Sequence, residues 1–250
     1  MDQGRIQSLR RWNLAMGVLH AAQGIAVVAL SNGFSLPVTA TFLTNAPGLE
    51  PPELSELFRV DLGWGVAAFL FLSAIAHFAI VSPPVFGWYI RNLDQQRNYA
   101  RWIEYSLSSS LMVVLIAMLT GISDISALIA LFGVNASMIL FGWLQEKYES
   151  PGGSGWLPYW FGVIAGAVPW VAIGIFLVTP GQSEAPPAFV YVIFVTLFVF
   201  FNSFAVNMVL QYRRRGRWAD YAFGEFVYVI LSLTAKSALA WQVFAGALAA

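Results

Sequence analysis

The sequence contains no cysteine, only two histidines and few charged residues. The lack of cysteine excludes disulfides, thiol catalysis and cysteine metal sites, and it leaves the redox compartment unreadable. Only 10% of the 250 residues are charged, against roughly 25% in soluble domains, and the formal net charge is zero. Without an excess of positive charge, nothing indicates a nucleic-acid partner. A composition that is 58% hydrophobic instead indicates an integral membrane protein.

Long apolar runs are what the chain does contain. Seven of them approach the ~20 residues that a membrane-spanning helix needs. They cover residues 12–31, 62–82, 99–120, 124–144, 156–179, 187–211 and 223–247. We therefore expect an all-α membrane protein in which residues 1–250 form a single seven-helix bundle. The first run is long and no clear cleavage site follows it, which favours a retained helix over a signal peptide.

Basic residues in the connections are strongly biased to one side of the expected bundle. Eleven lie on the N-terminal side, whereas the loops on the opposite side contain only Arg59. The eleven are Arg5, Arg10, Arg11, Arg91, Arg97, Arg101, Lys147, Arg213, Arg214, Arg215 and Arg217. The positive-inside rule then predicts a multi-pass protein of the cell membrane, with a cytoplasmic N-terminus and an extracellular C-terminus.

The long connection on the extracellular side, residues 32–61, has a pattern of its own. It contains the stretch SLPVTATFLT, in which β-branched residues alternate in part with others. Such alternation is typical of a β-strand. We expect a short β-hairpin in this loop between the first two helices.

One lysine interrupts the last apolar run near its middle. Lys236 lies within FGEFVYVILSLTAKSALAWQVF, residues 223–244, and we expect no other Lys or Arg deep in the seven runs. A charged side chain at mid-depth costs ~2.5–3.5 kcal/mol on insertion scales. Such an amine needs a counter-ion, or it reacts with an aldehyde to form a Schiff base. The lysine alone leaves open a second interpretation, a structural ion pair between two helices.

Four ionisable side chains are expected within the cytoplasmic part of the bilayer. These are His20, His77, Glu104 and Lys236. Neutral polar residues lie three or four positions from them and therefore on the same helix faces. They are Gln23, Ser73, Ser108 and Ser232. We expect Glu104 to be ionised and paired with Lys236, and pairing of Glu104 with Arg101 at the membrane surface is the alternative.

Several longer motifs resemble the heliorhodopsins, a family of microbial rhodopsins with inverted orientation. The motifs are RWIEYSLSSSLMVVLIA in the third run, FGVNASMILFGWLQEKY in the fourth and SLTAKSALAWQ in the seventh. The resemblance covers almost the whole chain, including VLHAAQGIAVVAL in the first run and PYWFG in the fifth. Ordinary microbial rhodopsins also carry a lysine in their seventh helix, but their orientation is opposite to the one that the basic residues predict here.

The resemblance implies a chromophore and a set of residues around it. Lys236 would bind all-trans retinal as a protonated Schiff base, with Glu104 as the counter-ion. The other residues expected at the chromophore are Tyr105, Ser108, Asn135, Met138, Phe201, Ser232 and Trp241. A proton-accepting polar cavity on the cytoplasmic side would contain His20, Gln23, Ser73 and His77. The family further implies a light sensor with a slow photocycle and no ion pumping, a homodimer and an unknown cytoplasmic signalling partner.

Other functions remain as alternatives. A light-gated or light-driven proton or ion transporter would need exchanging groups on both sides of the lysine. However, Leu115 lies eleven residues after Glu104, where the third helix of a pump would place a second carboxylate, and Asp124 lies only at the outer rim. A seven-helix receptor or small transporter could use Lys236 and Glu104 as a structural pair. We expect neither an enzyme nor a metal site, because no nucleophile–base pair or metal triad is recognisable.

Overall fold

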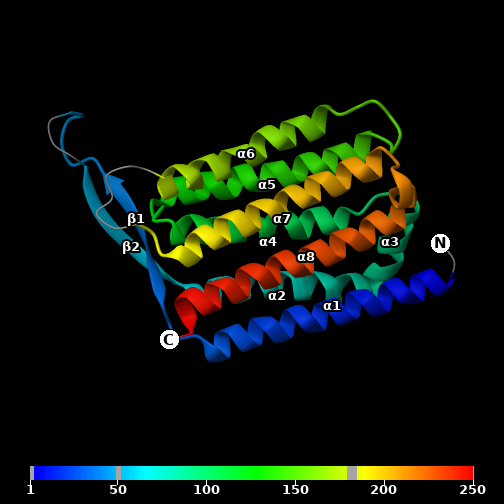
Figure 1. Ribbon diagram of the computed structural model, residues 1–250, viewed down its shortest axis with the longest axis horizontal. Helices are drawn as coiled ribbons and strands as arrows, with labels where there is room; N and C mark the ends of the chain where they lie inside the picture. Colours follow the sequence, from blue (N-terminus) through cyan, green and yellow to red (C-terminus); the bar gives the residue numbers. More distant parts are fainter. Residues whose placement is uncertain (1–2, 49–51, 179–184, 250) are drawn as a thin grey trace.

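The computed structural model describes residues 3–48, 52–178 and 185–249, and its long helices lie side by side in one bundle (Figure 1). Seven described helices are long and apolar enough to cross a membrane. They are α1 (Gln3–Leu30), α2 (Leu62–Val81), α4 (Tyr99–Leu119), α5 (Ile125–Tyr148), α6 (Leu157–Val178), α7 (Ala188–Tyr212) and α8 (Tyr221–Val243). The predicted all-α, seven-span membrane fold is confirmed.

Several helices differ from the apolar runs that predicted them. The first helix begins at Gln3 and the fourth span continues to Tyr148, because both continue into polar residues that hydropathy alone does not count. The connection after α2 contains another helix, α3 (Pro83–Asp94), which was expected to be a loop. Its two prolines occupy the first turn, where the lack of an N–H has no cost. Two short turns, η1 (Gly216–Ala219) and the π-helical η2 (Phe244–Leu248), flank α8.

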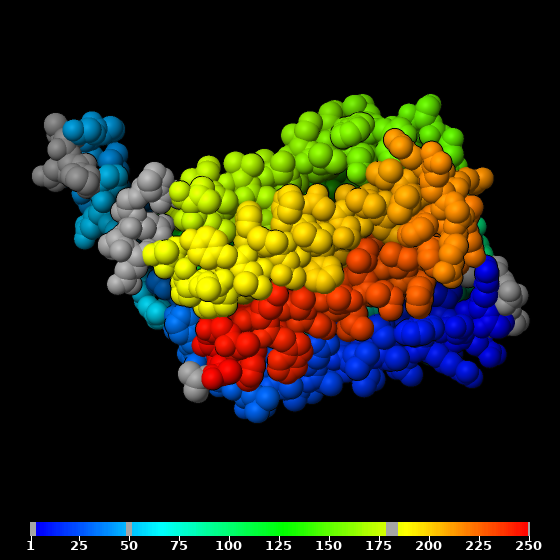
Figure 2. Space-filling model, viewed as in Figure 1, coloured from blue at the N-terminus to red at the C-terminus, as the bar shows by residue number. Residues whose placement is uncertain are grey.

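The predicted β-hairpin is present. Strands β1 (Ser35–Phe42) and β2 (Glu53–Asp61) pair antiparallel, with an irregularity between Val38 and Thr39. The hairpin extends from the end of the bundle where α8 finishes (Figures 1 and 2). Thr39 ties it to the α4–α5 connection, because its backbone N–H donates to the Ser123 carbonyl oxygen at 2.9 Å and the two hydroxyls lie 2.9 Å apart.

The packing order of the helices places α4 at the centre. Helix α2 packs between α1 and α4, α5 packs between α4 and α6, and α7 packs against α8. Fully buried apolar side chains such as Phe69, Ile116 and Leu239 fill the space between them. Many large apolar side chains on the outside are exposed, including Ile164 and Val195, and a bilayer would cover them. Helix α1 begins at one end of the bundle and α8 ends at the other (Figure 1).

We predict that Asp124→Ala lowers the free energy of unfolding by about 0.5–2 kcal/mol, the usual cost of losing an N-cap. Asp124 caps α5, because its Oδ1 accepts hydrogen bonds from the backbone N–H groups of Ser126 and Ala127 at 2.9 and 3.1 Å. Denaturant unfolding of the detergent-solubilised protein measures the change. Asp124→Asn keeps an acceptor at this position and should retain most of the stability. Equal losses in both variants would contradict a capping role.

Candidate functional site

Lys236 and Glu104 form a buried ion pair between α8 and α4. The Lys236 Nζ donates to the Glu104 Oε1 at 2.8 Å, and the two side chains are 4% and 10% exposed. At this separation and burial the two charges interact far more strongly than in water. The alternative partner of Glu104 is wrong, because Arg101 makes its ion pairs with other residues.

Hydroxyl groups complete the hydrogen bonding of this pair. Ser73 on α2 donates to the Glu104 Oε1 at 2.7 Å, and the Ser232 Oγ accepts from the Lys236 Nζ at 3.0 Å. Ser232 precedes Lys236 by one helical turn, so both side chains lie on the same face of α8. The ring of Tyr105 lies 5.1 Å from the Lys236 ammonium, within the range of a cation–π contact. Three helices thus hold the two charges in one fixed geometry.

The two histidines lie together on the α1 and α2 side of this pair. Their rings stack with centroids 5.7 Å apart, and the His77 Nδ1 lies 2.9 Å from the Asn13 Oδ1. Neither ring nitrogen of His20 has a hydrogen-bond partner among the described residues, although the side chain is fully buried. The described hydrogen bond of Gln23 is with a different residue, since its Oε1 accepts from the Trp241 Nε1 at 3.0 Å.

A cavity of about 310 Å³ opens beside Lys236, bounded by α4, α5, α6, α7 and α8. Six residues singled out from the sequence line it: Tyr105, Ser108, Met138, Phe201, Ser232 and Lys236. Two others do not. Asn135 lies behind the wall and donates to the Ser109 and Ser110 hydroxyls at 2.9 and 3.0 Å, while Trp241 is 39% exposed on the α1 side. The rotation of a helix about its axis decides whether a residue faces the cavity. The residue's place in a sequence motif does not reveal that rotation.

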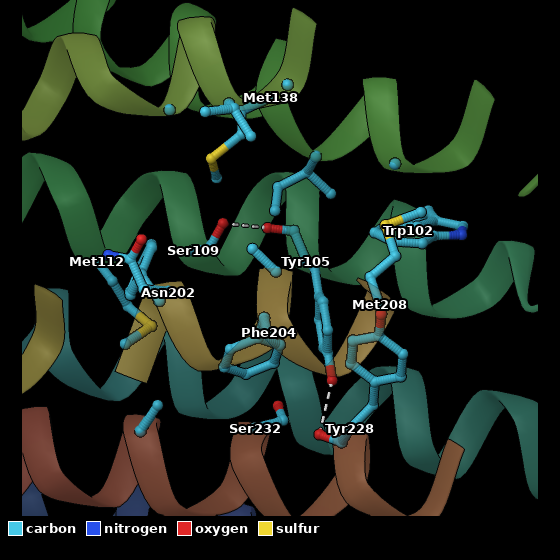
Figure 3. Close-up of a pocket in the computed structure, with 18 of the residues that line it drawn as sticks. Trp102, Tyr105, Ser109, Met112, Met138, Asn202, Phe204, Met208, Tyr228 and Ser232 are labelled. Atoms are coloured by element: carbon cyan, nitrogen blue, oxygen red, sulfur yellow. Dashed lines mark hydrogen bonds between the residues drawn. The ribbon is translucent and has the colours of Figure 1, made fainter. Parts of the chain in front are cut away.

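Aromatic and sulfur-containing side chains form a large part of the cavity wall. Lining residues that the sequence did not single out include Trp102, Met112, Phe204, Met208 and Tyr228 (Figure 3). Trp170 also lines the cavity. The Trp170 ring is surrounded edge-on by Phe194, Phe198 and Phe201 at 5.4–5.6 Å between centroids. Such a wall suits an apolar, conjugated ligand.

Small residues on α6 leave the space that this cavity occupies. Gly162 and Gly166 line it opposite Met138, and a Cβ added at Gly166 would lie only 2.5 Å from the Met138 Sδ. The volume falls at the lower end of the roughly 300–1,000 Å³ typical of small-molecule sites. An amine at one edge and apolar walls elsewhere fit a long apolar aldehyde such as retinal.

A second buried charge cluster was missed from the sequence. Arg101 donates through Nη2 to the Glu146 Oε1 at 2.8 Å and through Nη1 to the Glu225 Oε1. The three side chains are 4%, 2% and 5% exposed, so Arg101 is buried inside the bundle although it lies in the first turn of α4, whereas Lys236 lies near the middle of α8. All three lie within one or two turns of a helix end, and the count of basic residues in the connections therefore placed Arg101 at the membrane surface. Arg101 and Glu225 lie inside the apolar runs 99–120 and 223–247, and this position was the signal that could have found them.

Further donors surround the cluster of Arg101, Glu146 and Glu225. Glu146 also accepts from the backbone N–H of Asn98 at 2.8 Å, from the Trp102 Nε1 at 2.5 Å and from the Tyr221 hydroxyl at 2.9 Å. The Asn98 Nδ2 donates to the Glu225 Oε2 at 2.6 Å. The Arg101 guanidinium lies over the rings of Tyr228 and Trp102, at 3.9 and 4.4 Å from their centroids.

A small cavity of about 50 Å³ joins the two charge sites. Glu104 and His77 line it from one site, and Arg101 and Glu225 line it from the other. Its remaining polar walls include Asn13, Tyr89, Asn98 and Ser232. Within the described parts of the chain, no three or more His, Asp and Glu side chains gather in a way that could hold a metal ion.

Comparison with known proteins identifies relatives at the level of family and fold. A family model described as heliorhodopsin matches residues 9–248, whereas no curated protein sequence matches. The transmembrane domain and linker region of Salpingoeca rosetta rhodopsin phosphodiesterase is 13% identical, with a TM-score of 0.67 over 97% of this chain and 80% of that chain. A light-driven proton pump from Leptosphaeria maculans is 14% identical, with a TM-score of 0.66 over 95% of each chain.

A third similar structure is cyanorhodopsin from the cyanobacterium Calothrix. It is 13% identical, with a TM-score of 0.59 over 98% of this chain and 90% of that chain. At these identities the likeness shows the seven-helix rhodopsin fold alone.

We predict that Arg101→Met lowers the free energy of unfolding by roughly 3–5 kcal/mol, because it leaves buried carboxylates without their cation. Arg59→Met is the matched control, since Arg59 forms an exposed pair with Glu56 in which both side chains are about half exposed. That control should cost at most about 1 kcal/mol. Denaturant unfolding in detergent compares the two variants. Losses of similar size would show that the buried cluster is not specially stabilising.

Proposed function

The chain belongs to the heliorhodopsin family, and we propose that it is a light sensor carrying all-trans retinal on Lys236 as a protonated Schiff base. The observation that carries this proposal is the buried Lys236–Glu104 pair at the edge of an apolar cavity of about 310 Å³. When bound, retinal supplies absorption of visible light and isomerisation of a double bond. The residues of the chain would bind retinal and balance the positive charge of the Schiff base. They would also respond to the isomerisation with a shift in the positions of the helices.

Glu104 acts in this proposal as the counter-ion. Its carboxylate neutralises a cation on the Lys236 nitrogen, and the hydrogen bond from Ser73 fixes the position of the negative charge. Ser232 holds the lysine nitrogen from the same helix face. Because these groups are buried, a change in their separation alters the electrostatic energy strongly and biases the positions of α4 and α8.

The remaining residues divide into a chromophore wall and a polar cavity. Tyr105, Ser108, Met138 and Phe201 would contact the chromophore directly, since they line the cavity. Asn135 would support that wall through its hydrogen bonds to Ser109 and Ser110. Trp241 would contribute on the side that faces α1, where its Nε1 donates to the Gln23 Oε1.

We assign proton acceptance to the side of the lysine that His20 and His77 occupy. Their stacked rings lie beside the pair, His77 is oriented by Asn13, and both ring nitrogens of His20 lack a partner among the described residues. A buried imidazole whose ring nitrogens have no hydrogen-bond partner can take up a proton when a nearby negative charge stabilises the protonated ring.

A sensor fits the distribution of embedded charges better than a transporter does. Toward the hairpin end, α4 continues from Glu104 with the buried apolar residues Val113, Leu115 and Ile116. Among the described residues of that helix, no Asp, Glu, Lys, Arg or His follows Glu104. A transporter would need exchanging groups on both sides, so light-driven or light-gated ion transport is the alternative function. A measurement of light-dependent proton flux in vesicles separates the two.

We further propose that the protein lies in the cell membrane with a cytoplasmic N-terminus. In this proposal it forms a homodimer, signals to a cytoplasmic partner and has no enzymatic activity of its own. The seven apolar helices support the membrane location, and the basic residues of the connections support the orientation.

We predict that the protein expressed with all-trans retinal has a visible absorption band and that Lys236→Ala lacks it, because no amine remains to form the Schiff base. Lys147→Ala is the control, since Lys147 is an exposed lysine at the end of α5. It should keep the band of the unmodified protein. The absence of a band in both the unmodified protein and Lys236→Ala would refute the photoreceptor function and leave Lys236 as a structural charge.

We predict that Glu104→Gln shifts this band to the red. Removing the negative charge 2.8 Å from the lysine nitrogen destabilises the ground-state cation more than the excited state, in which the positive charge moves away along the polyene. Glu56→Gln, at an exposed glutamate of the hairpin, should leave the spectrum unchanged. Absorption spectra of the purified proteins measure both. An unchanged band in Glu104→Gln would remove Glu104 from the counter-ion role.

A further inference from the structure

The cluster of Arg101, Glu146 and Glu225 contains two carboxyl groups and one guanidinium. Arg101 bridges them and donates to both, and all three side chains are almost completely buried. Among the described residues, no other Lys or Arg forms an ion pair with either carboxyl group. If both carboxyls were ionised, the cluster would hold an uncompensated negative charge in a low-dielectric region, which is costly.

The neighbours of the cluster offer hydrogen bonds but no second positive charge. The titratable groups that face it or its cavity are His77 from α2, Tyr89 from α3, Glu104 and Tyr105 from α4, Tyr212 from α7, and Tyr221 and Tyr228 from α8. Phenols are neutral near pH 7. His77 makes its described hydrogen bond with Asn13 and none with either carboxyl of the cluster. The positive charge that would balance the second carboxylate must therefore come from a source other than these neighbouring side chains.

We propose that the Glu146–Glu225 pair is a proton-binding site that holds one proton in the resting protein. One proton on the pair makes the cluster neutral, with one carboxylate facing Arg101. Two carboxyls that share one buried site cannot both ionise freely, and they release their protons in two separate steps that belong to the pair. This site is distinct from the Lys236–Glu104 pair, where one cation already balances one anion.

The hydrogen bonds of the two carboxyls indicate which of them better accommodates the shared proton. Glu146 accepts four hydrogen bonds, from Arg101, Asn98, Trp102 and Tyr221, so its oxygens are arranged for the ionised form. Glu225 accepts only from Arg101 and Asn98, and it lines the small cavity. A proton on the pair is therefore better accommodated at the Glu225 end, where fewer donors compete with it.

The cavity gives this proton a destination. Glu225 lines the same space of about 50 Å³ as Glu104 and His77. In a transfer across it, the O–H bond at Glu225 breaks and an O–H bond at the Glu104 carboxylate or an N–H bond at the His77 imidazole forms. The cluster gains one negative charge and the acceptor gains one positive charge. The pair thus serves as a proton store on the side of Lys236 where the histidines lie.

Infrared spectroscopy of the dark protein at pH 7 tests the proposal. Wild-type-minus-variant spectra should contain the carbonyl stretch of one protonated carboxyl, shifted on exchange into D₂O, for both Glu146→Gln and Glu225→Gln. The band should be lost completely in each single variant, because the one carboxyl that remains faces Arg101 and ionises. Glu56→Gln, at an exposed glutamate, should remove no such band.

Conservative variants and a second protein form make the outcome decisive. Glu146→Asp and Glu225→Asp keep the carboxyl and should shift the band without removing it, which separates proton binding from misfolding. The spectra are recorded with and without retinal, so a failure of the photoreceptor function leaves this result readable. A wild-type protein without a protonated carboxyl, or a band that persists in either Gln variant, would overturn the proposal.

Discussion

A cation buried inside a membrane protein needs a negative partner close by, and two sites within this bundle are built around that requirement. Lys236 meets it with Glu104, and Arg101 meets it with Glu146 and Glu225. Both sites involve α4 and α8. Because Arg101 and Glu104 lie three residues apart on α4, satisfying one pair fixes the rotation of the helix and thereby the position of the other.

The cavity beside Lys236 depends on the same fixed rotation. Once α4 turns Glu104 toward α8, its next residues Tyr105 and Ser108 face the space between α5, α6 and α7. The glycines of α6 then keep that space open, while Trp170 and its phenylalanine neighbours close the far wall. Charge pairing between α4 and α8 and small residues on α6 therefore shape a single, mainly apolar site that has Lys236 in its wall.

Much of this could be read from residue order, and the rest depended on depth and rotation. Hydropathy located the seven spans, and one lysine in an apolar run located the site, because both signals are local. Arg101 was expected at the membrane surface, but its side chain is buried inside the bundle. The positive-inside rule counts charges near helix ends without saying which of their side chains point into the bundle. Asn135 and Trp241 belong to motifs of the family, yet the helix face on which each lies is set by packing between distant segments.

Asn98 gives the cluster of Arg101, Glu146 and Glu225 a mechanical connection. Its Oδ1 accepts from the backbone N–H of Arg101 at 3.1 Å and so starts α4, while its own backbone and side-chain N–H groups donate to Glu146 and Glu225. The residue that begins the central helix is therefore held by the very carboxyls whose charge can vary. A change of charge on these two carboxyls would therefore act directly on the residue that caps α4 and that lies in the short connection from α3.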